Sequence, residues 1–191
     1  MSSKNSILAA AIEILHSEGA GALTVRSVAN AAGCSTTGVY TWFGGKNGLV
    51  EAIFIDGFAR FGKALVRARK KAGIEGSPSD LAFAYRKWAL ANPTHYMVMF
   101  GRAVPDFCPS PDALIQARAT FEHLVESTAD LMQSTGVTGS PFEVAYHLWA
   151  GIHGYVSLEL AGMDMAENTA EQARRFAEGM RRLHIAWLQP N

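Results

Sequence analysis

The sequence predicts an all-α protein of about nine helices, with an N-terminal three-helix helix-turn-helix domain and a larger C-terminal helical domain. Three observations predict this class. Apolar residues recur every three or four positions in almost every segment. No stretch keeps the alternation of a β-strand, and glycines, prolines and hydroxyl residues punctuate the chain at helical lengths. With 191 residues, 49% of them apolar, the chain can bury a sizeable core.

The N-terminal third is predicted to hold three short helices and the start of a long one. Thr24 and Ser35 are expected N-caps, because a hydroxyl before a helix can accept a hydrogen bond from its first turn. Glycines end helices and break the chain between them. The expected elements are a first helix with the apolar stripe Ile7, Leu8, Ala11, Ile12 and Leu15, then helices over 25–32, 36–43 and 46–72.

The remaining two thirds are predicted to form five further helices. Ser79, Ser140 and Asn168 are expected to cap three of them, and Asn168 with Glu171 has the spacing of a capping box. Pro93 and Pro141 are suited to the first helical position. A linker-like loop at 73–79 and a proline-rich loop at 104–111 interrupt the series. The helices are expected over about 80–91, 93–103, 112–134, 141–162 and 168–188.

Charge is distributed unevenly, although the formal net charge is zero. Residues 1–71 carry nine Lys and Arg against four Asp and Glu, whereas residues 72–191 carry eight against thirteen. This split indicates a polyanionic partner for the first part, although uneven surface charge also occurs without function.

No apolar run is long enough for a membrane span, and Glu13 interrupts the first apolar stripe, which argues against a secretory signal. Two distant cysteines favour a reducing, cytoplasmic setting.

Two short helices joined by a glycine-containing turn, 25–32 and 36–43, have the form of a helix-turn-helix unit. The outer side of the second helix is rich in hydroxyl and aromatic groups that can contact phosphates or base edges. Gly38 would let the helix backbone approach DNA closely, and two cations could contact phosphates. The candidate DNA-binding residues are Arg26, Ser35, Thr36, Thr37, Gly38, Tyr40, Thr41, Trp42 and Lys46.

The stretch LTVRSVANAAGCSTTGVYTWFGGKNGLVEAI, residues 23–53, resembles the DNA-binding domain of the tetracycline-repressor-like (TetR) family of transcriptional regulators. The matching residues are Thr24, Val28, Ala29, Ala32, Gly33, Ser35, Val39, Tyr40, Phe43, Lys46 and Leu49. The resemblance implies that Tyr40 hydrogen-bonds a phosphate, that Thr36, Thr37 and Thr41 face the major groove, and that Lys46 clamps the backbone. Trp42 stands where many relatives have His, so packing against the first helix remains an alternative to a DNA contact.

In TetR-like proteins the C-terminal part binds ligand and forms the dimer. Here it is rich in methionines and aromatic residues, which line adaptable apolar cavities as well as cores. LWAGIHGYVSLELAG resembles a subgroup with a Trp-x-x-x-His-Gly signature, occupied by Trp149, His153 and Gly154. His153 could bind a ligand or be a core histidine satisfied by a neighbouring helix. The candidate ligand-binding residues are Tyr85, Trp88, Tyr96, Met99, Phe100, Phe107, Phe121, Trp149 and His153.

The resemblance implies a ligand-responsive regulator, a repressor that binds a near-palindromic double-stranded DNA operator as a homodimer and is released by a small apolar effector. We expect a DNA-binding domain at 1–48, a ligand-binding and dimerisation domain at 49–191, no cofactor, no membrane and no catalysis. The last two helices would pair with their copies. The expected interface residues are Leu158, Phe176, Met180, Leu183, His184 and Trp187.

Two other classes of function stay open at this point. A helical enzyme could use Glu143, His147 and His153, although their spacing does not complete a metal site. A helical adaptor could bind only protein through the C-terminal pocket. The enzyme alternative leaves the hydroxyl-rich helix and the charge split unexplained, and a DNA-binding assay separates the adaptor from the regulator. Cys34 is expected to be a small turn residue rather than a redox sensor, because no basic group is close to it in sequence.

Overall fold

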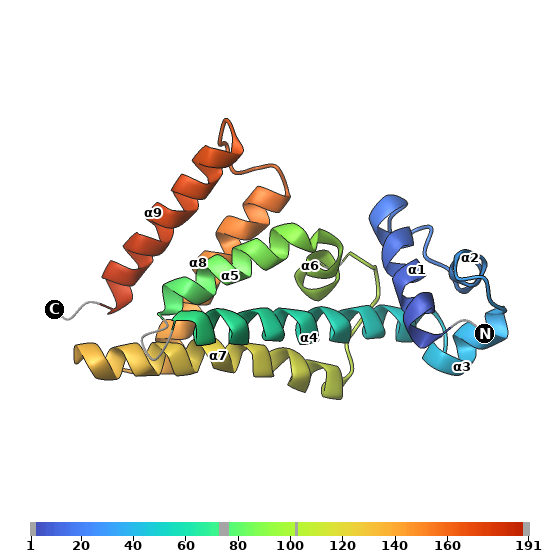
Figure 1. Cartoon of the computed structure of the whole chain (residues 1–191), viewed down its shortest axis with the longest axis horizontal. Helices are drawn as coiled ribbons and strands as arrows, with labels where there is room; N and C mark the ends of the chain where they lie inside the picture. Colours follow the sequence, from blue (N-terminus) through green and yellow to red (C-terminus); the bar gives the residue numbers. More distant parts are fainter. Residues whose placement is uncertain (1–2, 73–76, 102, 189–191) are drawn as a thin grey trace. The chain divides into compact units, whose positions relative to one another are not determined.

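The computed structural model describes residues 3–72, 77–101 and 103–188, which form nine helices and no strand (Figure 1). The all-α prediction is therefore confirmed. Contacts divide the chain into two compact units, one of Met1–Arg60 with Asn92–Ala117 and one of Phe61–Ala91 with Arg118–Asn191. In the described part of the chain, no helix is long and apolar enough to cross a membrane.

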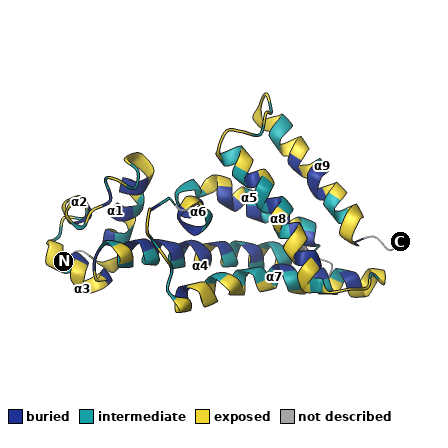
Figure 2. Cartoon of the chain, turned by 180° about the vertical axis from the view of Figure 1, so that it is seen from behind, coloured by how far each residue is buried: buried dark blue, intermediate teal, exposed yellow. Residues whose placement is uncertain are grey.

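The first unit holds the short helices predicted from the sequence. They are α1 (Lys4–Ser17), α2 (Val25–Ala31), α3 (Thr36–Phe43), the start of α4 (Lys46–Ala72), α6 (Pro93–Phe100) and the start of α7 (Pro111–Thr135). Helix α2 packs on both α1 and α3, and α6 packs on α1. Figure 2 shows the buried face of each helix in dark blue. The core side chains of the segment from α1 to α4, including Leu23 in the connection before α2, that are at most 1% exposed are Ile7, Ala11, Leu23, Val28, Ala29, Val39, Leu49, Val50 and Ile53.

Local capping explains why α2 and α3 begin where they do. The Thr24 hydroxyl accepts from the Ser27 backbone N–H at 3.0 Å, and Ser35 accepts from Gly38 at 3.2 Å. Gly44 ends α3 with a φ of 70°, in the left-handed region that favours glycine. Gly48 allows α4 to start close beneath α3, because a Cβ there would lie 1.7 Å from the Phe43 carbonyl oxygen.

The second unit contains α5 (Pro78–Ala91), α8 (Pro141–Leu160), α9 (Thr169–Leu188) and the remaining parts of α4 and α7. Helix α8 contacts both α5 and α9. The α8–α9 crossing is close: a Cβ at Gly151 would meet Leu183 at 2.5 Å, and one at Gly179 would meet the Tyr155 ring at 2.5 Å. Gly154, in contrast, has nothing within 4 Å of a Cβ position.

The structure differs from the sequence prediction in the start of α5, in the end of α6, which lies at Phe100 and not near 103, and in the capping of α9. Helix α5 begins at Pro78, and Ser77 rather than Ser79 caps it, because the Ser77 hydroxyl accepts from the Asp80 N–H while Asp80 accepts from Ser77. Residues 73–76 of the expected linker lie outside the described residues. Asn168 caps α9 through the Glu171 N–H at 3.0 Å, but the Glu171 carboxylate accepts from the Glu167 N–H instead of completing a capping box.

Candidate nucleic-acid interface and ligand residues

The outer side of α3 is open to solvent in the protein. Tyr40 is 57% exposed and Trp42 is 52% exposed, and Thr36, Thr37 and Thr41 are also exposed. Trp42 is therefore not buried against α1, which favours the DNA-facing alternative of the sequence analysis. The apolar residues of the same helix, Val39 and Phe43, point inward and are 0% and 8% exposed. Helix α3 thus separates its fold-forming side from its polar and aromatic side.

Hydrogen bonds leave several groups of α3 available to a ligand. Thr41 donates its hydroxyl proton to the Thr37 carbonyl at 2.8 Å, so its methyl group and oxygen lone pairs remain outward. The Ser35 hydroxyl oxygen is used by the N-cap. No described group accepts from the backbone N–H of Thr36 or Thr37. Unsatisfied N–H groups in the first turn of a helix, together with the helix dipole, favour an anion such as a phosphate.

Gly38 lies in the middle of this surface, and the protein's own packing does not require it to be glycine. A Cβ there would lie 3.7 Å from the Ser35 hydroxyl oxygen, an ordinary van der Waals distance. Glycine costs about 1 kcal/mol relative to alanine inside a helix. The packing of the protein itself therefore does not account for this glycine, and the close approach of DNA expected from the sequence stays a prediction.

The expected phosphate-binding cations have different surroundings. Arg26 is exposed in the first turn of α2. Lys46 is partly buried, and its ammonium donates to the Ala20 carbonyl oxygen at 3.2 Å, which ties the start of α4 to the loop before α2. Its other N–H groups remain available. Sequence reasoning missed Lys4, whose ammonium lies 5.7 Å from the centroid of the Phe43 ring at the end of α3. The sequence does not indicate that this lysine lies near α3, because Lys4 and Phe43 are far apart in the chain and only the fold brings them together.

The nine candidate ligand-binding residues divide between the two units. Four belong to the first unit, namely Tyr96, Met99, Phe100 and Phe107, and five belong to the second, namely Tyr85, Trp88, Phe121, Trp149 and His153. In the first unit, three of the four line an open groove of about 640 Å³ formed by the end of α6, the loop to α7 and Phe54 of α4. Tyr96 is 2% exposed and packs against Phe100, with ring centroids 5.1 Å apart.

In the second unit, Tyr85 and Trp88 of α5 are packed in the core. They are 4% and 8% exposed, and both rings pack against Phe61 of α4, with centroid distances of 5.1 and 5.2 Å. On α8 the Trp149 ring lies between Phe121 and His153, 5.8 Å from each centroid. The second unit therefore contains an aromatic cluster that crosses α4, α5, α7 and α8.

His153 is the polar centre of this cluster. Its Nδ1 lies 3.0 Å from the Tyr85 hydroxyl oxygen, and its Nε2 lies 3.4 Å from the Ser157 hydroxyl oxygen. Burial lowers the pKa of His153, which favours the neutral imidazole. The contact with Tyr85 of α5 is the kind of partner that a core histidine needs. A ligand role would require that a polar group of the ligand replace one of these hydroxyls.

The prediction of a dimer interface is wrong for two of its residues. Phe176 and Met180 are only 1% and 5% exposed, because they already fill the core of their own chain. Phe176 packs against Phe83 and Tyr155, with centroid distances of 5.5 and 6.1 Å. Leu158 and Trp187, by contrast, are 48% and 38% exposed.

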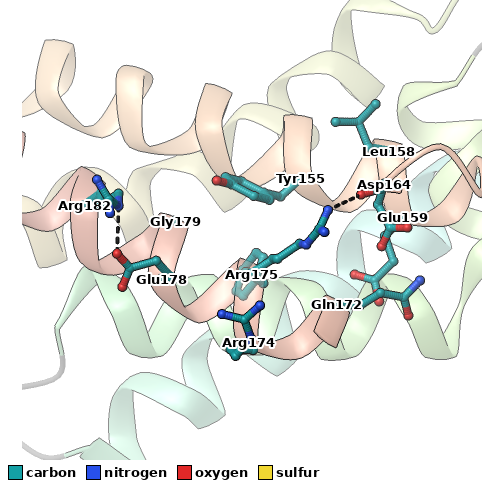
Figure 3. A pocket seen from close by; sticks show the side chains of 11 residues that line it. Tyr155, Leu158, Glu159, Asp164, Gln172, Arg174, Arg175, Glu178, Gly179 and Arg182 are labelled. Carbon is teal, nitrogen blue, oxygen red and sulfur yellow. Dashed lines mark hydrogen bonds and ion pairs between the residues drawn. The ribbon is translucent and has the colours of Figure 1, made fainter. Parts of the chain in front are cut away.

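Phe176 also lines a pocket of about 340 Å³ between α8 and α9, which is shown in Figure 3. Most charged groups around this pocket have partners: Glu178 and Arg182 pair within the lining, whereas Glu159 pairs with Arg86, and Arg174 and Arg175 pair with Glu171, outside it. Arg175 donates to the Asp164 carbonyl oxygen at 3.0 Å, and Arg182 donates to Glu178 at 2.7 Å. Hydrogen bonds with Arg181 and Arg182 lower the pKa of Glu178 to about 2. These pairs hold the α8–α9 loop and the exposed side of α9.

No group of three His, Cys, Asp or Glu side chains in the described ranges could hold a metal ion. The trio weighed in the sequence analysis, Glu143, His147 and His153, is not such a group. His147 instead stacks on Trp187 of α9, with ring centroids 4.4 Å apart and planes inclined by 7°. The α8 residues thus take part in helix packing.

Comparison with known proteins identifies both parts of the chain. Residues 7–53 match the model of bacterial regulatory proteins of the tetR family, and residues 79–183 match that of the tetracyclin repressor-like C-terminal domain. The HTH-type transcriptional regulator Rv1816 of Mycobacterium tuberculosis is 24% identical over 89% of this chain and 85% of its own length.

Solved structures show the same fold. The regulatory protein SCO4313 is 25% identical, with a TM-score of 0.81 over 94% of this chain and 93% of that one. A tetR family transcription regulator from Shewanella sp. PV-4 is 20% identical, with a TM-score of 0.69 over 94% and 96% of the two chains. The matched proteins are regulators and not enzymes. The chain therefore belongs to the tetR family of transcriptional regulators, with a DNA-binding helix-turn-helix at α2 and α3.

Proposed function

We propose that this regulator is a repressor that binds a near-palindromic operator as a homodimer in the cytoplasm and is released by a small apolar effector. The observation that supports it most is the exposed surface of α3, which carries hydroxyls and two aromatic rings, with unsatisfied N–H groups in its first turn. In a dimer, two such helices would enter successive major grooves about 34–36 Å apart. Thr36, Thr37 and Thr41 would contact base edges, and Tyr40 with Arg26, Lys46 and Ser35 would contact phosphates.

The operator contact is tested with Tyr40→Phe, which removes only the exposed hydroxyl. We expect weaker operator binding, measured by fluorescence anisotropy, with the dimer intact by analytical ultracentrifugation. Tyr155→Phe is the matched control, because Tyr155 is also an exposed tyrosine, 40% accessible, but lies on the side of α8 that lines the pocket with α9. Lys46→Ala should weaken binding further, but it also removes the bond to Ala20. Unchanged affinity in both Tyr40→Phe and Lys46→Ala would contradict the assigned contacts.

The homodimer is supported by a stripe on α8 that nothing in its own chain covers fully. Phe142, Tyr146 and Leu158 are about half exposed, and Ala150 and Gly154 lie between them at four-residue spacing. Side chains four positions apart form one ridge of a helix. Gly154 has open space where a Cβ would stand, so a partner helix could approach there. Gly154→Arg should produce monomers in ultracentrifugation, whereas Ala173→Arg on exposed α9 should not.

Effector release is supported by α4, which begins next to the DNA-binding helix α3 and continues to the aromatic residues of the second unit. Within the second unit, Phe61 of α4 packs on Tyr85 and Trp88, and within the first unit α4 begins next to α3. Helix α6 also contacts the DNA-binding part, since His95 lies 3.1 Å from Asp56 of α4 and His16 of α1 lies 3.1 Å from Thr94. An effector among the candidate ligand residues would displace α4 and α6, and coupling of about 1–3 kcal/mol is typical.

The effector site is tested with Trp149→Ala, which removes the ring between Phe121 and His153. We expect this variant to bind the operator as the wild type does but to need more effector for release. An unchanged effector response would remove Trp149 from the site. The Trp-x-x-x-His-Gly signature of the subgroup stays a prediction until this test is made.

A further inference from the structure

The groove of the first unit combines an aromatic wall with one described carboxylate. Its wall is apolar and aromatic, with Phe54, Phe100 and Phe107 and the side chain of Met99. The charged group among its described lining residues is Asp106, which is exposed and has no described hydrogen-bond or ion-pair partner. Its volume of about 640 Å³ is in the range of small-molecule sites, about 300–1,000 Å³.

Hydrogen bonds tie the described loop segment 103–110, which carries Asp106. Phe107 N–H donates to the Val104 carbonyl at 3.4 Å, Pro105 lies between them, and Asp106 has a φ of 63°. This is the pattern of a type II turn, in which proline suits the second position and a left-handed residue the third. The two ends of the loop are also tied, because Ala103 N–H donates to Met97 and Ser110 N–H donates to Glu51 at 2.9 Å. The hydrogen bonds from Ser110 lower the pKa of Glu51, so this carboxylate stays ionised as an acceptor.

We propose that this groove binds a small organic cation with an aromatic or alkylated onium group. Aromatic faces attract cations through the ring quadrupole, and the Asp106 carboxylate adds a complementary charge at the mouth. Among the described lining residues, an anion would meet this carboxylate and no cation. A hard metal ion needs several oxygen ligands, and the groove offers one carboxylate on an apolar wall. Because Met99, Phe100 and Phe107 are also candidate effector residues, the proposal rests on the proposed effector function for its role in release. Binding itself is measured without DNA, so failure of the groove proposal is distinguishable from failure of the repressor proposal.

The test compares three probes on the full-length protein by calorimetry and NMR titration: phenyltrimethylammonium, its neutral isostere tert-butylbenzene, and the anion 4-tert-butylbenzoate. We expect the cation to bind about fivefold more tightly than the neutral isostere, as one exposed cation–π contact with a nearby carboxylate predicts. The anion should bind more weakly than both. Equal affinity for the cation and the neutral probe, or no cation binding at millimolar concentrations, would overturn the proposal.

Two variants assign the effect to the groove. Asp106→Asn keeps the size of the side chain, and asparagine tolerates a positive φ, so the turn should persist while the preference for the cation disappears. Phe107→Leu should weaken both the cation and the neutral probe. Asp112→Asn is the matched control, because Asp112 is an exposed carboxylate in the first turn of α7 outside the groove lining. Full cation preference in Asp106→Asn, or its loss in Asp112→Asn, would contradict the assignment.

Discussion

The same pair of residue types behaves in opposite ways in α3 and α5. In α3, Tyr40 and Trp42 are 57% and 52% exposed, whereas Tyr85 and Trp88 of α5 are 4% and 8% exposed. The first pair shares its helix surface with threonines and an unobstructed glycine. The second pair packs on Phe61 and reaches His153. Residue type alone therefore does not distinguish a recognition surface from a core. The surroundings of the side chains do: the aromatic residues of α3 face solvent, whereas those of α5 pack on Phe61 and reach His153.

The largest expected difference is in stability. Trp88→Ala removes a ring packed in the second unit, and truncating a large buried side chain costs about 3–5 kcal/mol. Trp42→Ala removes an exposed ring, and surface changes are usually within about 0.5 kcal/mol. Urea unfolding of both variants measures the contrast. If Trp42→Ala destabilised the protein as much as Trp88→Ala does, Trp42 would stabilise the fold, and its assignment to DNA recognition would be contradicted.

The second largest expected difference is between a buried and an exposed pair of opposite charges. Arg86 donates to Glu159 through two hydrogen bonds of 2.7 and 2.6 Å, and the two side chains are only 17% and 9% exposed. Arg86→Met leaves a buried carboxylate without its partner, which we expect to cost about 3 kcal/mol. Arg174→Met affects a pair that is 74% exposed on the arginine side and 3.6 Å long, so it should cost less than about 0.5 kcal/mol. Thermal unfolding at neutral pH compares them, and equal losses would show that the α5–α8 pair is not a structural tie.

Gly38→Ala separates folding from recognition within α3. A methyl group fits in the protein, and replacing a helical glycine stabilises by up to about 1 kcal/mol. The same methyl group should obstruct the close approach of DNA and weaken operator binding. Unfolding curves and anisotropy on one protein sample measure both effects. A variant that is more stable and binds DNA normally would show that the glycine does not serve recognition.

The smallest expected effect is on the pH dependence of stability. Burial lowers the pKa of His153 and also that of His95, for which the bond to Asp56 acts in the opposite direction. The folded protein therefore binds fewer protons than the unfolded chain once the pH falls below the ordinary histidine value of about 6.5. Stability should decline from pH 7.5 to 5.5 and level off below the folded pKa values. His153→Phe should flatten this slope, as measured by thermal unfolding at several pH values, and an unchanged slope would count against a buried neutral imidazole.

The parts of the fold that could be predicted from the sequence are those that local rules determine. Thr24 and Ser35 cap α2 and α3 through bonds within four residues, and the bounds of α3 and α4 follow from Gly44 and Gly45. The outward side of α3 follows in the same way, because Val39 and Phe43 fix the inward side. The contacts of that side with DNA stay predictions.

Features that depend on distant segments could not be predicted. The candidate ligand residues were chosen for type, yet Met99 and Trp149 belong to different units because the chain returns to the first unit at Asn92. The sequence predicts Phe176 at the dimer interface, because periodicity shows the apolar face of a helix but not which neighbour covers it. Lys4 and the Asp106 turn were missed for the same reason: only the folded chain places them beside Phe43 and the groove.

The most direct test of the central claim is selection of bound sequences from a random DNA pool, with the wild type and a Thr37→Ala/Tyr40→Phe double variant in parallel. The account predicts that the wild type enriches a near-palindromic sequence and that the double variant, still folded and dimeric, loses it. Binding should also weaken steeply with salt if phosphates are engaged. Enrichment of the same sequence at the same affinity by both proteins, or none by the wild type, would contradict the role of α3.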